Sequence, residues 1–223
     1  MIRAELWGDS IGKGVLFDEV RGRYAIAKNH FIKLLKNAGI ADINSHARFG
    51  ATVEEGLQDF EATRQVESDI VVIEFGGNDC DMPWENIARE PQADYQAKTP
   101  LALFEKKIEA FVLAVRERGL RPLLVTPPPL DAQRFFAWVS RGLNARNILG
   151  FVSEVPFIYR WHEQYSLAVR RAAQKTACRL FDLRDAFLSE RNLRAALSID
   201  GMHPNERGHV LIADAVRNFI VNL

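Results

Sequence analysis

The chain has 223 residues, the length of one large domain or two small ones. Hydrophobic residues make up 48% of it and charged residues 26%, values that are typical of a folded globular chain and argue against disorder. Lys plus Arg number 29, as do Asp plus Glu, so the formal net charge is zero. This balance argues against nucleic acid or an anionic membrane as a partner, because both attract a surplus of basic residues.

The cysteine content and the first residues indicate where the protein works. Cys80 and Cys178 lie far apart and neither belongs to a C-x-x-C pair, so we expect neither a disulfide framework nor structural zinc. The opening residues, MIRAELWGDS, hold no apolar run of signal-peptide length. No stretch approaches the length of a membrane-spanning helix either. We therefore expect a cytoplasmic location.

Short apolar runs alternate with longer stretches of helical period, a pattern typical of βα units on a parallel sheet. The strands expected from these runs are residues 2–7, 41–45, 69–75, 123–126 and 179–182. The run at 69–75 is almost continuously apolar, which indicates a strand covered on both faces. The fold class predicted from this pattern is α/β.

The expected helices come between and after these strands. The first covers residues 24–37, with Ile26, Phe31 and Leu34 on one side, and ends at Gly39. Another opens with Thr99 as its N-cap and Pro100 at its first helical position. The remaining two run from about residue 156 to 176 and from Asn205, as N-cap, to the end of the chain.

Residues 1–223 are expected to form a single domain. Two of its segments belong to none of the strands and helices expected above. They are residues 80–98 and 130–155, both rich in aromatic side chains. Each follows a strand, so each should lie above the carboxyl edge of the sheet, where open α/β sheets bind ligands. They could form the walls or lid of a pocket. Local core beneath long loops and a dimer contact are the alternatives.

A glycine-rich turn, residues 8–14 (GDSIGKG), follows the first strand directly. It is not a Walker loop, because Gly14 follows Lys13 where that motif needs serine or threonine. It is not a dinucleotide loop, because Phe17 stands where the third glycine is required. The pentad G-x-S-x-G matches at Ser10, but in α/β-hydrolases that turn lies behind several strands. What remains is a serine on a tight strand-to-helix turn, a position that a helix N-cap also explains.

A second candidate element, Asp200-Gly201-Met202-His203-Pro204, precedes the last helix. Serine is a poor nucleophile at neutral pH and needs a base beside it. Histidine suits this task, and a carboxylate can fix its tautomer. Asp200 and His203, three residues apart on a turn, can face one pocket. The other histidines are expected in surface or packing roles: His30, His46, His162 and His209.

Two further turns follow other strands. Asn78, in the sequence Gly76-Gly77-Asn78-Asp79, could aim its side-chain N–H at a developing oxyanion. Gly50 can present a backbone N–H while Thr52 caps the next helix. Taken singly, each is also an ordinary turn.

Together these four elements resemble the SGNH family of GDSL-type esterases and lipases. The blocks occur in order across nearly the whole chain: Gly8-Asp9-Ser10 with Gly14, then Gly50, then Gly76-x-Asn78-Asp79, then Asp200-x-x-His203-Pro204. The resemblance implies a three-layer, flavodoxin-like sandwich with helices on both faces of about five parallel strands, in the order 2-1-3-4-5. It also implies a serine hydrolase that acts on ester bonds without a metal or other cofactor.

The resemblance implies a role for each site residue as well. Ser10 would be the nucleophile, His203 the base and Asp200 the residue that orients the base. The oxyanion hole would comprise the Ser10 N–H, the Gly50 N–H and the Asn78 side chain. Among their neighbours, we expect Asp9 to form hydrogen bonds within its turn, Asp79 to brace Asn78, and Cys80 to line the pocket wall.

The substrate is less sharply predicted than the reaction. An acetylated sugar, a short acyl ester and a thioester all stay open, and we favour a small acyl group. Four arginines in or near the second extra segment could favour an anionic substrate or only solvate a helix: Arg134, Arg141, Arg146 and Arg160. The expected partner is a small-molecule ester, with a homo-oligomer left open.

Two other function classes compete with the esterase. One is a non-catalytic module on the same fold that binds carbohydrate or a partner protein; the complete set of Ser10, Asp200 and His203 argues against it. The other is a flavodoxin-type nucleotide or flavin binder, in which Asp9 would repel phosphate after the first strand.

Overall fold

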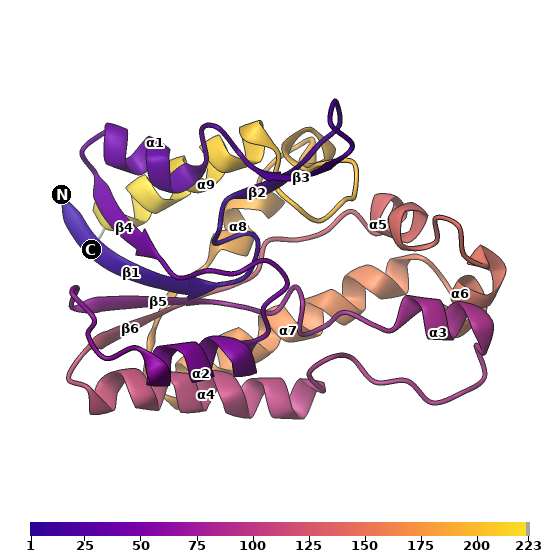
Figure 1. The fold of residues 1–223 in the computed structure, drawn as a ribbon, viewed down its shortest axis with the longest axis horizontal. Helices are drawn as coiled ribbons and strands as arrows, with labels where there is room; N and C mark the ends of the chain where they lie inside the picture. Colours follow the sequence, from indigo (N-terminus) through magenta and orange to yellow (C-terminus); the bar gives the residue numbers. More distant parts are fainter. Residues whose placement is uncertain (222–223) are drawn as a thin grey trace.

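The computed structural model describes residues 1–221. Its centre is a five-stranded sheet in the order β4-β1-β5-β6-β7, with every neighbouring pair parallel (Figure 1). The strands are β1 (Ile2–Gly8), β4 (Ala41–Ser45), β5 (Ile70–Glu74), β6 (Arg121–Val125) and β7 (Arg179–Phe181). Counted in chain order within this sheet, the order is 2-1-3-4-5. The expected α/β fold class and strand order are confirmed.

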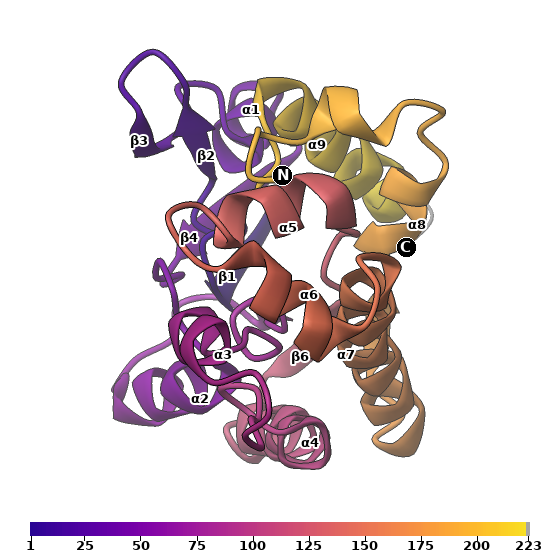
Figure 2. The same cartoon turned by 90° about the vertical axis from the view of Figure 1, so that its right-hand side faces the viewer.

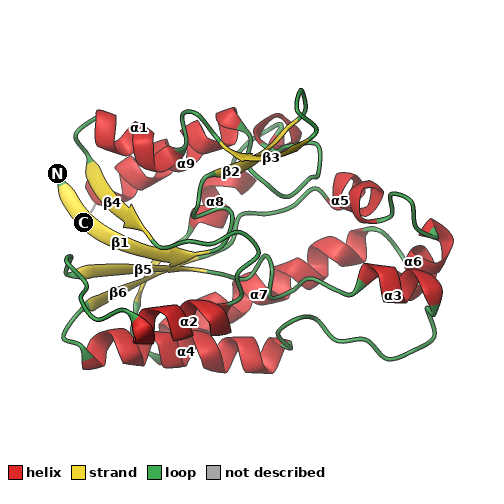
Figure 3. Ribbon diagram, in the orientation of Figure 1, coloured by secondary structure: helices red, strands yellow, loops and turns green. Residues whose placement is uncertain are grey.

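Helices cover both faces of the sheet, which makes three layers (Figure 3). One face carries α1 (Phe31–Asn37) and α9 (Glu206–Val221), and the other carries α2 (Val53–Ala62), α4 (Leu101–Glu117) and α7 (Pro156–Lys175). Side chains of β5 alternate between two cores, because successive residues of a strand point to opposite faces. Val71 and Ile73 join the core with α4 and α7, whereas Val72 packs against the core with α1 and α9.

The start of α4 differs from the expectation. Pro100 is the N-cap, and the helix begins at Leu101. The Thr99 hydroxyl instead donates a hydrogen bond of 2.7 Å to the buried carboxylate of Asp79. The capping prediction was therefore wrong because a tertiary acceptor takes the hydroxyl. The expected cap at Asn205 is confirmed, since its Oδ1 accepts the N–H of Gly208 at 3.1 Å.

The helix expected over residues 24–37 was also wrong in its first half. The structure has an antiparallel hairpin, β2 (Val15–Asp18) and β3 (Arg23–Ile26), and α1 begins only at Phe31. The hairpin turn closes because Asp18 accepts backbone N–H groups of Val20 and Arg21, while Gly22 takes a positive φ of 62°. The hairpin therefore projects Phe17 and Tyr24 as a packed pair.

The two extra segments contain short helices that lie beyond the carboxyl ends of the strands. They are α3 (Trp84–Arg89), α5 (Ala132–Val139) and α6 (Ala145–Val152). Figure 2 shows the molecule from this side, with these helices in front of the sheet. The remaining short elements, α8 (Leu183–Leu188) and the 3-10 helix η1 (Leu193–Ala196), pack with α9. Within residues 1–221 no helix combines the length and apolar character needed to cross a membrane.

Helix α2 packs so closely that Gly56 has no room for a side chain. A Cβ at this position would lie 2.1 Å from the Cζ atom of Phe75. We expect Gly56→Ala to lower the free energy of unfolding by about 1–3 kcal/mol, because the ring has to move in a close-packed core. Gly150→Ala is the control: its Cβ meets nothing within 4 Å on α6, so alanine should stabilise the helix by about 0.5–1 kcal/mol. Urea unfolding measures both, and an equal response would contradict the packing argument.

Candidate active site

Ser10 lies on a tight turn at the carboxyl end of β1. The turn closes through backbone hydrogen bonds from Lys13 N–H to Asp9 C=O at 3.0 Å and from Val15 N–H to Ser10 C=O at 2.9 Å. The Asp9 carboxylate accepts the N–H of Ile11 at 2.8 Å, as expected for a hydrogen bond within this turn. Ser10 itself is buried. Its side chain is therefore held by the turn rather than free in solvent.

Folding brings the two ends of the chain together at this serine. The Ser10 Oγ lies 2.8 Å from the Nε2 of His203. On the other side of the imidazole, the Nδ1 lies 2.6 Å from the Oδ2 of Asp200. In the tautomer that fits both contacts, Nδ1–H donates to the carboxylate and Nε2 accepts the serine hydroxyl. This arrangement suits general-base activation of the serine.

The environment keeps the Asp200 carboxylate ionised. Burial opposes its charge, but the hydrogen bond from His203 and the attraction of its imidazole lower the pKa of Asp200 below the usual value. The backbone N–H groups of Met202 and His203 add to this effect by donating to Oδ1 at 3.0 and 3.1 Å. The carboxylate can therefore hold the imidazole in one orientation and stabilise it when it takes a proton.

The turn that carries Asp200 and His203 is fixed from outside by the second extra segment. Gly201 adopts a positive φ of 74°, and its C=O accepts the N–H of Asp131, just before α5, at 2.7 Å. A Cβ on Gly201 would lie 2.7 Å from the backbone oxygen of Asp131. The hairpin holds the same region, because the Phe17 N–H donates to the Ser198 hydroxyl at 3.2 Å.

The loops with the other two predicted residues are fastened next to Ser10. The Arg48 N–H donates to the Gly8 C=O at 3.0 Å, which holds the loop with Gly50 against the end of β1. Gly50 has a positive φ of 79°. On the opposite side, the loop with Asn78 packs on the nucleophile turn, since a Cβ on Gly77 would lie 3.2 Å from the Oδ2 of Asp9. The four predicted blocks thus meet at one sheet edge.

The Asp79 side chain, in the loop after β5, links this loop to the start of α2 and to Thr99. The side chain is fully buried and accepts hydrogen bonds from the Thr99 hydroxyl at 2.7 Å and from the Val53 N–H, at the start of α2, at 3.1 Å. Burial raises the pKa of Asp79 to about 7, although these hydrogen bonds favour the ionised form. Asp79, which was expected to brace Asn78, therefore anchors the start of the helix that follows Gly50.

An aromatic wall beside His203 was missed by the sequence analysis. The Tyr24 ring centroid lies 4.9 Å from that of His203, and the Phe49 ring lies 6.1 Å away with its plane nearly parallel to the imidazole. Trp138 of α5 packs on both Phe17 and Tyr24. Burial and the nearby Asp200 carboxylate raise the pKa of Tyr24 well above its usual range. The strand-like alternation around Phe17 and the turn at Arg21-Gly22 were the features that could have revealed this hairpin.

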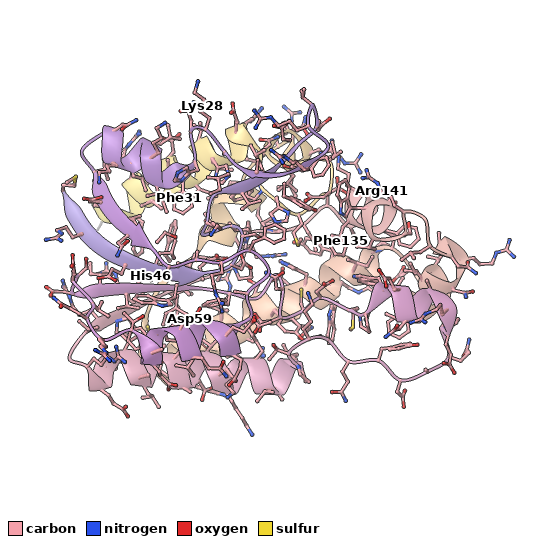
Figure 4. All side chains as sticks on the ribbon, in the orientation of Figure 1. Lys28, Phe31, His46, Asp59, Phe135 and Arg141 are labelled. Atoms are coloured by element: carbon pink, nitrogen blue, oxygen red, sulfur yellow. The ribbon has the colours of Figure 1, made fainter. Side chains whose placement is uncertain are left out.

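Three of the four arginines near the site have different partners in the structure. Arg134 donates to the backbone oxygens of Arg194 and Leu197, and Arg160 pairs with Glu154 at 2.7 Å. Arg141 lies over the ring of Trp138, 3.6 Å from its centroid, at the side of the molecule beyond the strand ends (Figure 4).

A small apolar pocket adjoins the Asp200–His203 turn, since Met202 is one of its lining residues. It lies between the loop after β5, the Asp200–His203 turn and helices α5, α6 and α7, and it leaves about 20 Å³ of free space. Phe135, labelled in Figure 4, forms part of its wall. Other residues that line it include Gly77, Cys80, Trp84, Trp161 and Met202. Burial raises the pKa of the Cys80 thiol well above its usual value, so Cys80 acts here as an apolar wall residue.

Comparison with known proteins gives the family of this chain. The family model described as the GDSL-like lipase/acylhydrolase family matches residues 6–211. The chain belongs to this family. The matched range includes the turn with Ser10, the loops with Gly50 and Asn78, and the Asp200–His203 turn. No curated protein sequence matches the chain.

Solved structures with the same fold include a lipase/acylhydrolase and two esterases. A lipase/acylhydrolase from Enterococcus faecalis has 20% identity and a TM-score of 0.69, covering 100% of this chain and 96% of its own. An acetyl xylan esterase, AlAXEase, has 21% identity and a TM-score of 0.65, covering 98% and 99%. An acetyl-xylooligosaccharide esterase from Geobacillus Stearmophilus has 20% identity and a TM-score of 0.66, covering 98% and 94%.

The raised pKa of Asp79 predicts how stability depends on pH. Between about pH 4 and pH 7 the native state keeps a proton on Asp79 that the unfolded chain has released. Raising the pH through this window should therefore lower the free energy of unfolding, by at most about 1.4 kcal/mol per pH unit from this one group. Asp79→Asn should remove that slope. Urea unfolding of both proteins across the window measures it, and parallel curves would contradict the prediction.

Proposed function

We propose that the protein is a serine esterase that hydrolyses short acyl esters through an acyl-enzyme. The observation that supports this most directly is the pair of contacts on His203, 2.8 Å to the Ser10 hydroxyl and 2.6 Å to Asp200. Membership of an acylhydrolase family supports ester hydrolysis in general. The two similar structures named as acetyl esterases favour acetyl esters among the candidates.

The proposed reaction has two steps. Ser10 Oγ attacks the ester carbonyl while His203 Nε2 takes the hydroxyl proton, and Asp200 stabilises the imidazolium that forms. The C–O bond to the alcohol then breaks, and His203 gives its proton to the departing oxygen. Water, activated by the same imidazole, attacks the acyl carbonyl and releases the acid with Ser10 restored.

The oxyanion would be held by the N–H groups of Ser10 and Gly50 and by the side chain of Asn78. These groups sit on three loops that are fastened to one another through Arg48, Gly77 and Asp79. Donors that are fixed before the reaction stabilise charge that appears only in the transition state. The rigidity of these loops therefore supports the assignment.

The small apolar pocket beside the Asp200–His203 turn supports a short acyl group. Its free space of about 20 Å³ has room for roughly one methyl-sized group. Gly77 and Met202 line it, next in sequence to the proposed donor Asn78 and base His203. An acetyl methyl group would be enclosed there by apolar side chains, whereas a long chain would require them to move.

The activity itself is tested with p-nitrophenyl esters of increasing acyl length. We expect hydrolysis of the acetate by the wild type and almost none by Ser10→Ala, because the nucleophile is gone. Asn78→Ala should lower kcat by about 10²–10³-fold through the lost oxyanion donor. A wild type that is inert on every ester, with Ser10 unlabelled by a fluorophosphonate, would refute the proposed function.

Acyl length should respond to the size of the pocket. Phe135→Ala enlarges the wall and should shift the preferred substrate from acetate toward longer acyl groups, measured as the ratio of kcat/KM for hexanoate to acetate. Phe219→Ala is the control, because it removes an aromatic ring that packs on Phe181 of β7, on the α9 face of the sheet. It should affect stability without changing the ratio. An unchanged ratio in Phe135→Ala would show that the acyl group lies elsewhere.

A further inference from the structure

Two buried carboxyl groups lie next to the turn of Ser10, and neither takes part in the proposed reaction. Asp9 precedes Ser10 and is 1% exposed, and Glu74 ends β5 and is 3% exposed. The sheet register pairs Glu74 with Gly8. A Cβ on Gly8 would lie 2.9 Å from the Oε2 of Glu74. The carboxyl of Glu74 is therefore pressed against the start of the nucleophile turn.

Each carboxyl accepts a hydrogen bond from the backbone N–H of one residue that follows Ser10. Asp9 Oδ1 accepts the N–H of Ile11 at 2.8 Å, and Glu74 Oε2 accepts the N–H of Gly12 at 3.1 Å. The two side chains also face each other closely enough for a hydrogen bond between them to influence the ionisation of both. Together they fasten the two residues that follow the nucleophile.

No lysine or arginine among residues 1–221 forms an ion pair with either carboxyl. Lys13, the nearest in sequence, directs its Nζ to the backbone oxygen of Ala47. The titratable groups that act on the pair are His203 from the turn before α9, and Asp79 and Cys80 from the loop after β5. The imidazole is thus the cation available to the pair, and only while it is protonated.

The other side of Glu74 faces an apolar cavity of about 100 Å³ between the sheet and helices α1 and α9. Leu6, Ile11 and Val125 are among the side chains that line it, and Glu74 is the one charged residue of this lining within the described part of the chain. The Oε1 of Glu74 accepts no hydrogen bond from an N–H or O–H group of residues 1–221. A full negative charge on Glu74 would therefore be poorly solvated.

Two carboxylates in contact cannot both remain ionised in such a place, because their repulsion adds to the cost of burial. One proton placed between them turns the repulsion into an O–H···O⁻ hydrogen bond, which is short and strong. Burial raises the pKa of both Asp9 and Glu74. The pair then titrates as a unit rather than as two separate acids.

We propose that Asp9 and Glu74 are positioning residues that share one proton and in that form hold the turn of Ser10 in its reactive geometry. The inference rests on the proposed function of Ser10. With the proton in place, the pair keeps the Ile11 and Gly12 N–H groups fixed, so the Ser10 hydroxyl stays aimed at His203. Loss of the proton at alkaline pH leaves two adjacent negative charges, which push β5 and the turn apart.

Three variants test the pair. Glu74→Gln keeps the shape, accepts the Gly12 N–H through its oxygen and donates to Asp9 through its nitrogen, so it mimics the protonated side chain. Glu74→Leu removes the acceptor. Glu5→Gln is the matched control: Glu5 is a glutamate of β1 that is 1% exposed and accepts backbone N–H groups of Glu67 and Ser68, but it lies away from Ser10. Circular dichroism confirms that each variant is folded, and Asp9→Asn replaces Glu74→Gln if the latter is not.

The first readout is the dependence of kcat on pH with p-nitrophenyl acetate. The wild type and Glu5→Gln should lose kcat on the alkaline side, whereas Glu74→Gln should keep its neutral-pH kcat there. Glu74→Leu should lose about 10–100-fold in kcat at neutral pH with a much smaller change in KM, because a displaced nucleophile slows the chemical step. An unchanged alkaline limb in Glu74→Gln, or full kcat in Glu74→Leu, overturns the proposal.

The second readout does not need activity. Carbon-13 NMR of protein labelled at the Asp and Glu carboxyl carbons is recorded in Asp79→Asn, because burial also raises the pKa of Asp79, to about 7. It should show one carboxyl that still holds a proton at neutral pH, and adding Glu74→Gln should abolish that behaviour. If the signals of both Asp9 and Glu74 titrate in the ordinary acidic range, the shared proton is refuted even when the esterase is active. If no ester is hydrolysed yet the shared proton is present, the proposed function fails, and with it the positioning role.

Discussion

The hydrogen bond between Ser10 and His203 joins a turn after the first strand to a turn before the last helix, and the rest of the site is arranged around it. Each partner has a separate support. The turn of Ser10 is held by Asp9 and Glu74, and the Asp200–His203 turn is held by the N–H of Asp131, which donates to the Gly201 C=O. Serine is a poor nucleophile without a base beside it, and the separation of 2.8 Å between Ser10 Oγ and His203 Nε2 is what allows the proposed activation.

Buried carboxyl groups around this bond are stabilised in different ways. Asp200 is kept ionised by His203 and two backbone N–H groups, so its pKa is lowered. Asp79 accepts three hydrogen bonds, from Thr99 Oγ1 and from Val53 N–H through both carboxylate oxygens, yet burial still raises its pKa. Asp9 and Glu74 lie beside each other, and no lysine or arginine of residues 1–221 forms an ion pair with them. The same functional group therefore has a lowered pKa in one place and a raised pKa in another, according to what surrounds it.

Short local patterns predicted the sheet well. The five strand runs needed only an apolar composition and a length of a few residues, and the parallel order followed from the family resemblance. The hairpin of residues 15–26 was missed because its alternation of apolar and polar residues is short and interrupted by charged residues. The helical pattern that begins at Phe31 was also extended too far toward the N-terminus, so Tyr24 was assigned to a helix. The Thr99 cap failed for a different reason, since its hydroxyl found a better acceptor in Asp79, far from it in sequence.

Sequence alone determined the chemical types at the site and the strand ends that carry them. Ser10, Gly50, Asn78, Asp200 and His203 each follow or precede a predictable element, and parallel strands place their carboxyl ends at one edge. Tertiary structure decided what surrounds them: the aromatic wall of Tyr24 and Trp138, the small apolar pocket, and the contact between Asp9 and Glu74. The single glutamate in an otherwise apolar strand hinted at a buried partner, but its identity depends on the pairing of β5 with β1. Such contacts join residues distant in the chain, and no local pattern encodes them.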